Sequence, residues 1–165
     1  YRLVKKEAKF EIRFYPAATF AKIYSQGTDY KSVSSSGFRQ LAGYIFGGNE
    51  KSQSIAMTAP VRMELNEKGS TMSFVMPEQY QESDLPKPKD SRVHIVQSSP
   101  QYVAAIRFSG YADDAKIQAK RDELLKLIQQ AGMKVIGEYS FLGYNAPFQF
   151  WGRKNEVVIP IEWKE

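Results

Sequence analysis

The fold is decided by residues 10–27, FEIRFYPAATFAKIYSQG, and by a second stretch that repeats their pattern, residues 93–110, VHIVQSSPQYVAAIRFSG. In both stretches apolar and polar side chains alternate, the alternation breaks, and an extended segment then leads to a glycine. Alternation with a period of two is typical of β-strands, so each stretch predicts two strands. Phe10 matches Val93, a spacing of 83 residues, and several further apolar positions match at the same spacing. The match predicts an internal duplication.

The segments that follow the two stretches also correspond. Both begin with apolar side chains at helical spacing, which predict helices at residues 29–46 and 112–131, the first with Asp29 as its N-cap. Each helix precedes two predicted strands, at 55–65 and 71–76 in the first half and at about 133–144 and 155–163 in the second. The repeated unit is therefore strand–helix–strand–strand, at about 10–77 and 93–160. We expect one α+β domain over residues 1–165, with pseudo-two-fold symmetry and a cleft where the repeats meet.

Composition narrows the class of protein. The chain has 165 residues, 42% hydrophobic and 25% charged, and no apolar run approaches the roughly 20 residues of a spanning helix, so we expect a soluble globular protein. It has no cysteine, which excludes disulfides, thiolate-held metals and a cysteine nucleophile. The net charge of +5 comes from scattered basic residues, a pattern that favours a small anionic ligand over nucleic acid. Localisation and oligomeric state stay open.

Residues with catalytic or metal-binding chemistry are few. The only histidine, His94, alternates with apolar neighbours and is expected on the polar surface of its strand, which excludes a multi-histidine metal site. Met72 and Met76 fall on the apolar side of a predicted strand and are expected in the core. We therefore predict no catalytic residue and no metal ligand.

The most informative stretch is GYNAPFQFWGRKNE, residues 143–156, which joins four aromatic rings to Arg153 and Lys154 in a predicted loop. Exposed aromatic rings tend to line a binding surface, and adjacent cations at its rim suit acidic groups. Glu156, which follows them, is expected at the surface; if it points into the cleft, it is instead a buried acid or a receptor for a cation.

These residues also carry a family resemblance. IAMTAPV (55–61), IRFSG (106–110), GYNAP (143–147) and RKNEV (153–157) resemble motifs of the SOUL haem-binding protein family, in the family's order and spacing from about residue 10 to 163. The resemblance implies a twisted antiparallel β-barrel of two strand–helix–strand–strand repeats with two flanking helices, similar to the effector-binding domains of bacterial multidrug-response activators. It also implies a non-enzymatic carrier or buffer that binds haem or a related tetrapyrrole in a shallow apolar cleft.

In the family this cleft lies between the first helix and the loop before the last strand. Carried over to this sequence, its residues are Phe38, Leu41, Ala42, Ile45, Tyr144, Pro147, Phe148, Phe150, Arg153 and Lys154. The chain departs from the family at three proposed contacts: Phe14 stands where one branch has an axial histidine, and Ser35 and Gly43 stand where another has basic residues. An apolar cleft without an iron ligand predicts an affinity that is moderate and independent of the metal.

Two alternatives remain open at this stage. The first is a module similar to the effector-binding domains, which would take lipophilic cations through Glu156 and the aromatic loop. The second is a hydrolase with Glu156 as general base and Tyr139 or Tyr144 as its helper.

Overall fold

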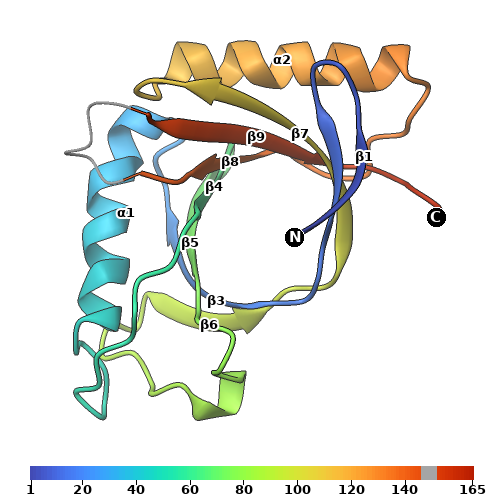
Figure 1. Cartoon of the computed structure of the whole chain (residues 1–165). Coiled ribbons are helices and arrows are strands. Elements are labelled where there is room, and N and C mark those ends of the chain that lie inside the picture. Colours follow the sequence, from blue (N-terminus) through green and yellow to red (C-terminus); the bar gives the residue numbers. More distant parts are fainter. Residues whose placement is uncertain (146–151) are drawn as a thin grey trace. The chain divides into compact units, whose positions relative to one another are not determined.

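A computed structural model of the chain describes residues 1–145 and 152–165. The chain forms two compact units, which we describe separately. Unit 1 consists of residues 1–17 and 99–165, and unit 2 consists of the continuous segment 18–98. Figure 1 shows the elements of both units in the colours of the sequence.

Unit 2 is an antiparallel sheet with one long helix. Its elements are β3 (Thr19–Ser25), α1 (Tyr30–Ile45), β4 (Val61–Asn66), β5 (Gly69–Val75), a short 3-10 turn η1 (Glu82–Asp84) and β6 (Val93–Gln97). Within the unit the strands lie in the order β4–β5–β3–β6, and each neighbouring pair is antiparallel. The helix begins where predicted, because the Asp29 side chain accepts a hydrogen bond from the Ser32 backbone N–H at 2.8 Å.

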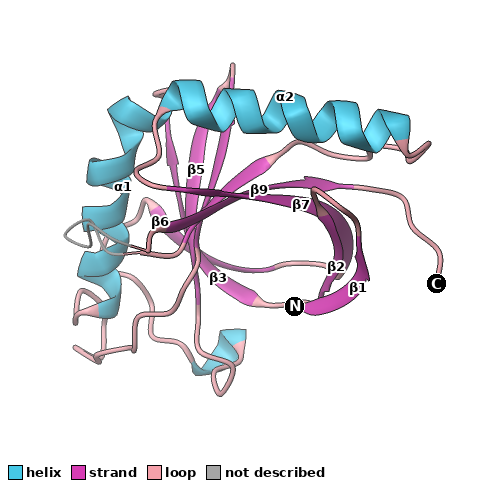
Figure 2. Cartoon of the chain, turned by 45° about the horizontal axis from the view of Figure 1, so that its top comes forward, coloured by secondary structure: helices cyan, strands magenta, loops and turns pink. Residues whose placement is uncertain are grey.

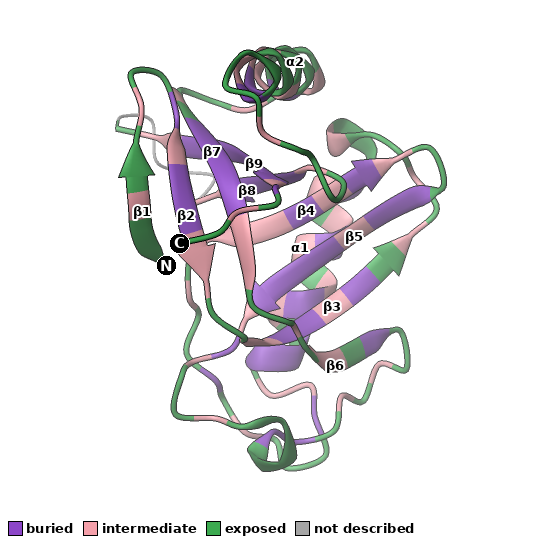
Figure 3. Ribbon diagram, turned by 90° about the vertical axis from the view of Figure 1, so that its right-hand side faces the viewer, coloured by how far each residue is buried: buried purple, intermediate pink, exposed green. Residues whose placement is uncertain are grey.

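Helix α1 packs on one face of this sheet through its apolar stripe. Met72 and Phe74 of β5 point toward the helix: Gly37 lies directly over Met72, and the Phe38 and Phe74 ring centroids are 5.4 Å apart. Met72 is buried, as its place in the pattern predicted, and Figure 3 shows β5 buried along most of its length. The absence of a side chain at Gly37 lets helix and sheet approach closely.

Unit 1 is a second antiparallel sheet with a second helix. Its elements are β1 (Arg2–Lys6), β2 (Glu11–Tyr15), β7 (Gln101–Ser109), α2 (Asp114–Gln130), β8 (Ser140–Gly143) and β9 (Lys154–Pro160), and the strand order is β1–β2–β7–β9–β8. Asp113 caps α2 by accepting from the Lys116 N–H. The buried side of α2, formed by Ile117, Leu124 and Ile128, packs on β7 and β9 (Figure 2).

The first strand of each predicted repeat pairs outside its own repeat. Strand β2 precedes β3 in the chain but pairs with β7, whereas β6 precedes β7 but pairs with β3. The two pairings have equivalent registers. Phe20 lies opposite Val96, and Val103 and Arg13, their equivalents at the repeat spacing of 83 residues, also lie opposite each other. The compact units therefore do not coincide with the sequence repeats.

The α+β class, with antiparallel strands and two flanking helices, is confirmed, and both helices lie within two residues of their predicted ends. The predictions of strands at 55–65 and 133–144 were wrong in length, because the strands cover only Val61–Asn66 and Ser140–Gly143. Pro60 lies directly before β4, and because proline has no N–H to donate, it limits the strand at that end. Strand β1 was not predicted. Among the described residues, no helix is long and apolar enough to span a membrane.

Candidate functional site

Of the four predicted ligand contacts on helix α1, two lie in the core and two lie near the surface. Leu41 and Ile45 are 0% and 1% exposed and belong to the core of unit 2. Phe38 and Ala42 are half-buried at the border of the outer surface. Only the second pair is placed to meet a ligand without a rearrangement of the helix.

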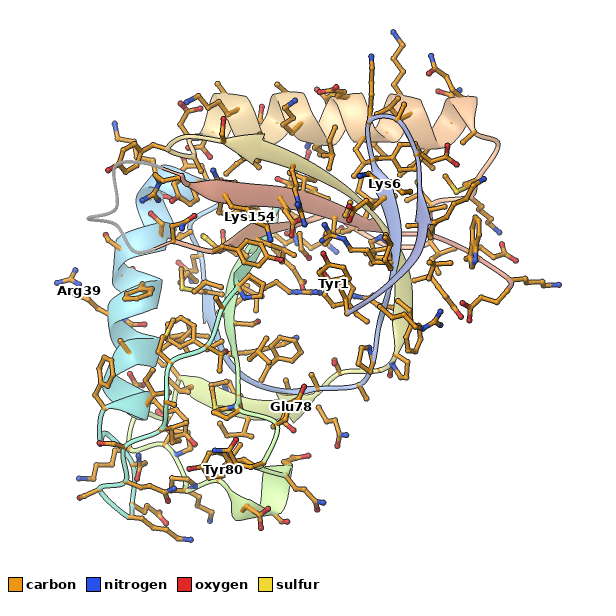
Figure 4. The ribbon with its side chains drawn as sticks, in the orientation of Figure 1. Tyr1, Lys6, Arg39, Glu78, Tyr80 and Lys154 are labelled. Atoms are coloured by element: carbon orange, nitrogen blue, oxygen red, sulfur yellow. The ribbon has the colours of Figure 1, made fainter. Side chains whose placement is uncertain are left out.

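A strip of apolar residues follows the outer surface of α1 from this border. Phe38, Ala42 and Phe46 succeed one another at intervals of four residues, so they lie on neighbouring turns, and we call them the outer strip. Phe46 is 67% exposed, which is unusual for so large an apolar side chain. Beside the strip Gly43 leaves open space, and Figure 4 shows Arg39 pointing outward from the helix.

Phe46 was missed by the sequence analysis because it stands at the end of the predicted helix. Its backbone N–H still donates to the Ala42 carbonyl at 3.0 Å, so the residue caps α1. The interval of four from Phe38 through Ala42 to Phe46 is the signal that could have identified it.

The predicted loop contacts belong to unit 1. Pro147, Phe148 and Phe150 lie outside the described residues. The Arg153 guanidinium carbon lies 4.1 Å from the centroid of the Tyr111 ring, and Lys154 Nζ lies 4.0 Å from that of Tyr144. Both cations are therefore held against aromatic faces.

Glu156 is buried in unit 1 at the centre of a charged group that we call the Glu156 cluster: Glu156, Arg13, Arg107 and Tyr144. The expectation of a surface glutamate was wrong, since the side chains of Glu156 and Arg13 are both 0% exposed. Arg13 Nη2 donates to Glu156 Oε2, and Arg107 Nε donates to the same oxygen at 2.9 Å. The Tyr144 hydroxyl donates to the other carboxylate oxygen.

The sheet register assembles this cluster. Arg107 of β7 lies directly opposite Glu156 of β9, so their side chains share one face of the sheet. Arg13 reaches the carboxylate from β2 and also donates through Nε to Glu11 at 2.9 Å. With Glu11 included, two carboxylates balance two guanidinium groups, which makes the full burial of Arg13 and Glu156 tolerable.

The cluster fixes the protonation of its members. Burial by itself raises the pKa of Glu156, but the hydrogen bonds from Arg13, Tyr144 and Arg107 and the charge of Arg13 outweigh it and lower the pKa to about 2. Burial and the bond to Glu156 raise the pKa of Tyr144 above its usual range. Glu156 is therefore a stable anion, unlike a general base, whose pKa must lie near the working pH.

The described residues contain no cluster of side chains that could hold a metal ion. His94 is exposed on β6, as predicted, and no group of three potential metal ligands occurs among residues 1–145 and 152–165. At Phe14 the ring packs 5.1 Å from that of Tyr102 and supplies no ligand atom.

A family model and individual relatives point to the same protein family. The model of the family described as SOUL heme-binding protein matches residues 1–160. Heme-binding protein 2 of Mus musculus is 34% identical over 159 residues, covering 91% of this chain and 77% of that protein. Its Homo sapiens counterpart is 33% identical over the same shares.

Similarity to solved structures extends to more distant proteins. The C-terminal domain of EcmrR gives a TM-score of 0.69 at 8% identity and covers 93% of this chain and 97% of its own. A likeness at this level of identity concerns the fold alone.

Proposed function

Because the chain belongs to the SOUL heme-binding protein family, we propose that it binds haem or a related tetrapyrrole on the outer strip of α1, as a carrier or buffer rather than an enzyme. The observation that carries the location is the exposure of Phe46, continued by Ala42 and Phe38 along one side of the helix. We propose also that residues 1–165 act as one domain, since the family match crosses both units.

Each residue of the strip has a simple part in this binding. The Phe46 ring offers apolar surface, the small Ala42 lets a flat macrocycle approach the helix, and Phe38 is held in place by Phe74. A phenylalanine buries roughly 150–250 Å², so covering the exposed two-thirds of Phe46 would contribute about 2.5–4 kcal/mol at about 25 cal/mol per Å². Bound haem would supply the iron and two propionates, and the strip would supply contact that does not depend on the metal.

Cations for the propionates are also present in the chain. In unit 1, Arg153 and Lys154 remain our candidates, together with Tyr144, whose ring supports Lys154. Removing either charge should weaken an anionic porphyrin more than an uncharged one.

The Glu156 cluster supports binding over catalysis. A carboxylate with a pKa of about 2 is a poor proton acceptor, which argues against a hydrolase that uses Glu156 as base. Tyr139 is the other proposed helper, and the centroid of its ring lies 5.3 Å from the Arg121 guanidinium carbon. A lipophilic cation would have to replace Arg13 or Arg107 at Glu156, so the cationic alternative gains no support either.

Titration with haemin and with metal-free protoporphyrin, followed by the Soret band and tryptophan fluorescence, tests the proposal. We expect saturable one-to-one binding of both with similar affinity, weakened about tenfold in F46A because part of the apolar contact is lost. L125A is the matched control, since Leu125 is an exposed apolar residue of α2. Binding weaker than tens of micromolar, or equal binding by F46A and the parent, would contradict the proposal.

A further inference from the structure

The sheet face of unit 2 that points away from α1 carries a row of basic side chains. Residues directly opposite one another in antiparallel strands share a face. The register places Lys22 of β3 opposite His94 of β6 and opposite Ser73 of β5, and places Ser73 opposite Arg62 of β4. Because Met72 and Phe74, on either side of Ser73, face the helix, the row lies on the opposite face.

The two strong cations of this row both lie near the ring of Phe20. Lys22 Nζ and Arg62 Cζ each lie 5.8 Å from the centroid of the same ring, that of Phe20. Two like charges held over one ring repel each other, and an anion between them would relieve the repulsion. Within residues 1–145 and 152–165, Lys22 makes no ion pair.

Ser73 adds an independent sign of a missing ligand. The residue is 1% exposed, and its hydroxyl has no hydrogen-bond partner in the described part of the chain. A buried hydroxyl without a partner is costly, on the order of 1–3 kcal/mol. The hydroxyl lies between the Lys22 and Arg62 strands, where it would donate to an anion held by both cations.

An apolar row lies next to the basic one. Phe20 is opposite Val75 on one side and Val96 on the other, two residues along from Lys22 and therefore on the same face. Glu64 lies on the other side of the basic row, two residues beyond Arg62. A ligand with its charge at the basic row would therefore extend its apolar part toward the buried Phe20 and over the partly exposed Val75 and Val96, away from Glu64.

From this arrangement we infer that unit 2 has a second binding site, for an aliphatic carboxylate, with the carboxylate at Lys22, Arg62 and Ser73 and the chain over Phe20, Val75 and Val96. Arginine suits a carboxylate because its two N–H groups match the two oxygens, and Lys22 adds a second charge. The contrast with unit 1 is chemical: there Arg13 and Arg107 share a protein carboxylate, whereas here the residue between the cations is a serine. The site is independent of the tetrapyrrole surface, which lies on the outer side of α1.

Calorimetric titration with laurate, with dodecyl alcohol and with dodecyltrimethylammonium tests this inference. We expect laurate to bind at least tenfold more tightly than either of the others, and the K22M/R62M double variant to lose at least tenfold in laurate affinity. K51M/K68M is the control, because it removes two exposed charges of the same unit elsewhere. S73A, which keeps the volume of the site nearly unchanged, should weaken laurate severalfold and provides the test if the double variant does not fold.

The outcomes separate this site from the tetrapyrrole site. Equal affinity for laurate and dodecyl alcohol, or unchanged laurate binding in both K22M/R62M and S73A, would overturn the inference. Displacement of laurate by haemin would overturn the independence of the two sites, whereas simultaneous binding would support it. Failure of haemin to bind would concern the proposed function alone, since the laurate titration does not depend on it.

Discussion

Replacement of Glu156 by Gln should destabilise the protein by about 3 kcal/mol at pH 7. The change removes the fully buried one of the two carboxylates that compensate Arg13, and breaking a buried ion pair from one side costs about 3–5 kcal/mol. The pKa gives a similar magnitude: a fall from 4.5 to about 2, at about 1.4 kcal/mol per unit, corresponds to roughly 3 kcal/mol. Urea denaturation of parent and variant at pH 7 measures the difference directly.

The pH dependence of this difference has a definite sign. Because folding lowers the pKa of Glu156, the stabilisation is complete above the unfolded value of 4.5 and is lost as the pH falls toward 2. The free-energy gap between parent and E156Q should therefore narrow between pH 6 and pH 3. A loss below 1 kcal/mol at pH 7, or a gap that does not change with pH, would refute the argument.

Two further variants isolate burial as the cause. Glu165 also has a pKa lowered to about 2, through hydrogen bonds from Arg2 and Tyr102, but it is exposed to solvent. E165Q should therefore leave the urea midpoint nearly unchanged. The double variant R13M/E156L should be more stable than E156Q, because it removes both fully buried charges, whereas Glu11 and Arg107, which lose their partners, are in contact with solvent.

Three other substitutions have expected outcomes in the same denaturation assay. L41A should cost about 2–5 kcal/mol because Leu41 is fully buried, and a loss under 1 kcal/mol would contradict its place in the core. D29A should cost about 1 kcal/mol by removing the N-cap of α1, accompanied by a lower helical signal in circular dichroism; an unchanged signal and midpoint would argue against the cap. G69A should destabilise by about 1–3 kcal/mol, because Gly69 has a φ of +138° and a Cβ there would lie 2.6 Å from the Ser25 carbonyl oxygen; a fully stable variant would exclude this turn geometry.

The sequence predicted the local elements well because their signals are local. The helix ends follow from Asp29 and from the glycines that come after each helix, and the core position of Met72 follows from alternation. Strand pairing depends on residues far apart in the chain, so neither the pairing of β2 with β7 nor the edge strand β1 could be obtained from one segment.

The site was less predictable for a related reason. Alternation shows which residues share a strand face but not whether that face meets water, so Glu156 was expected at the surface and the burial of Arg13 was not predicted. Leu41 and Ile45 have the apolar character of ligand contacts, yet their angular position on α1 places them in the core. Phe46 is the last residue of the predicted helix and was not counted among its apolar positions.

Because the first strand of each repeat pairs with the other repeat, the two units can be completed only one after the other during synthesis. All strand pairs of unit 2 close within the continuous segment 18–98, so its sheet is complete while the remaining residues are still to be added. Strand β2 is made before any of these, yet its partner β7 follows only about 90 residues later, and such distant pairing is slow to form. During translation β2 can pair with β1, but its other edge must wait for β7, and Arg13 stays separated from Glu156 until β9 has been made.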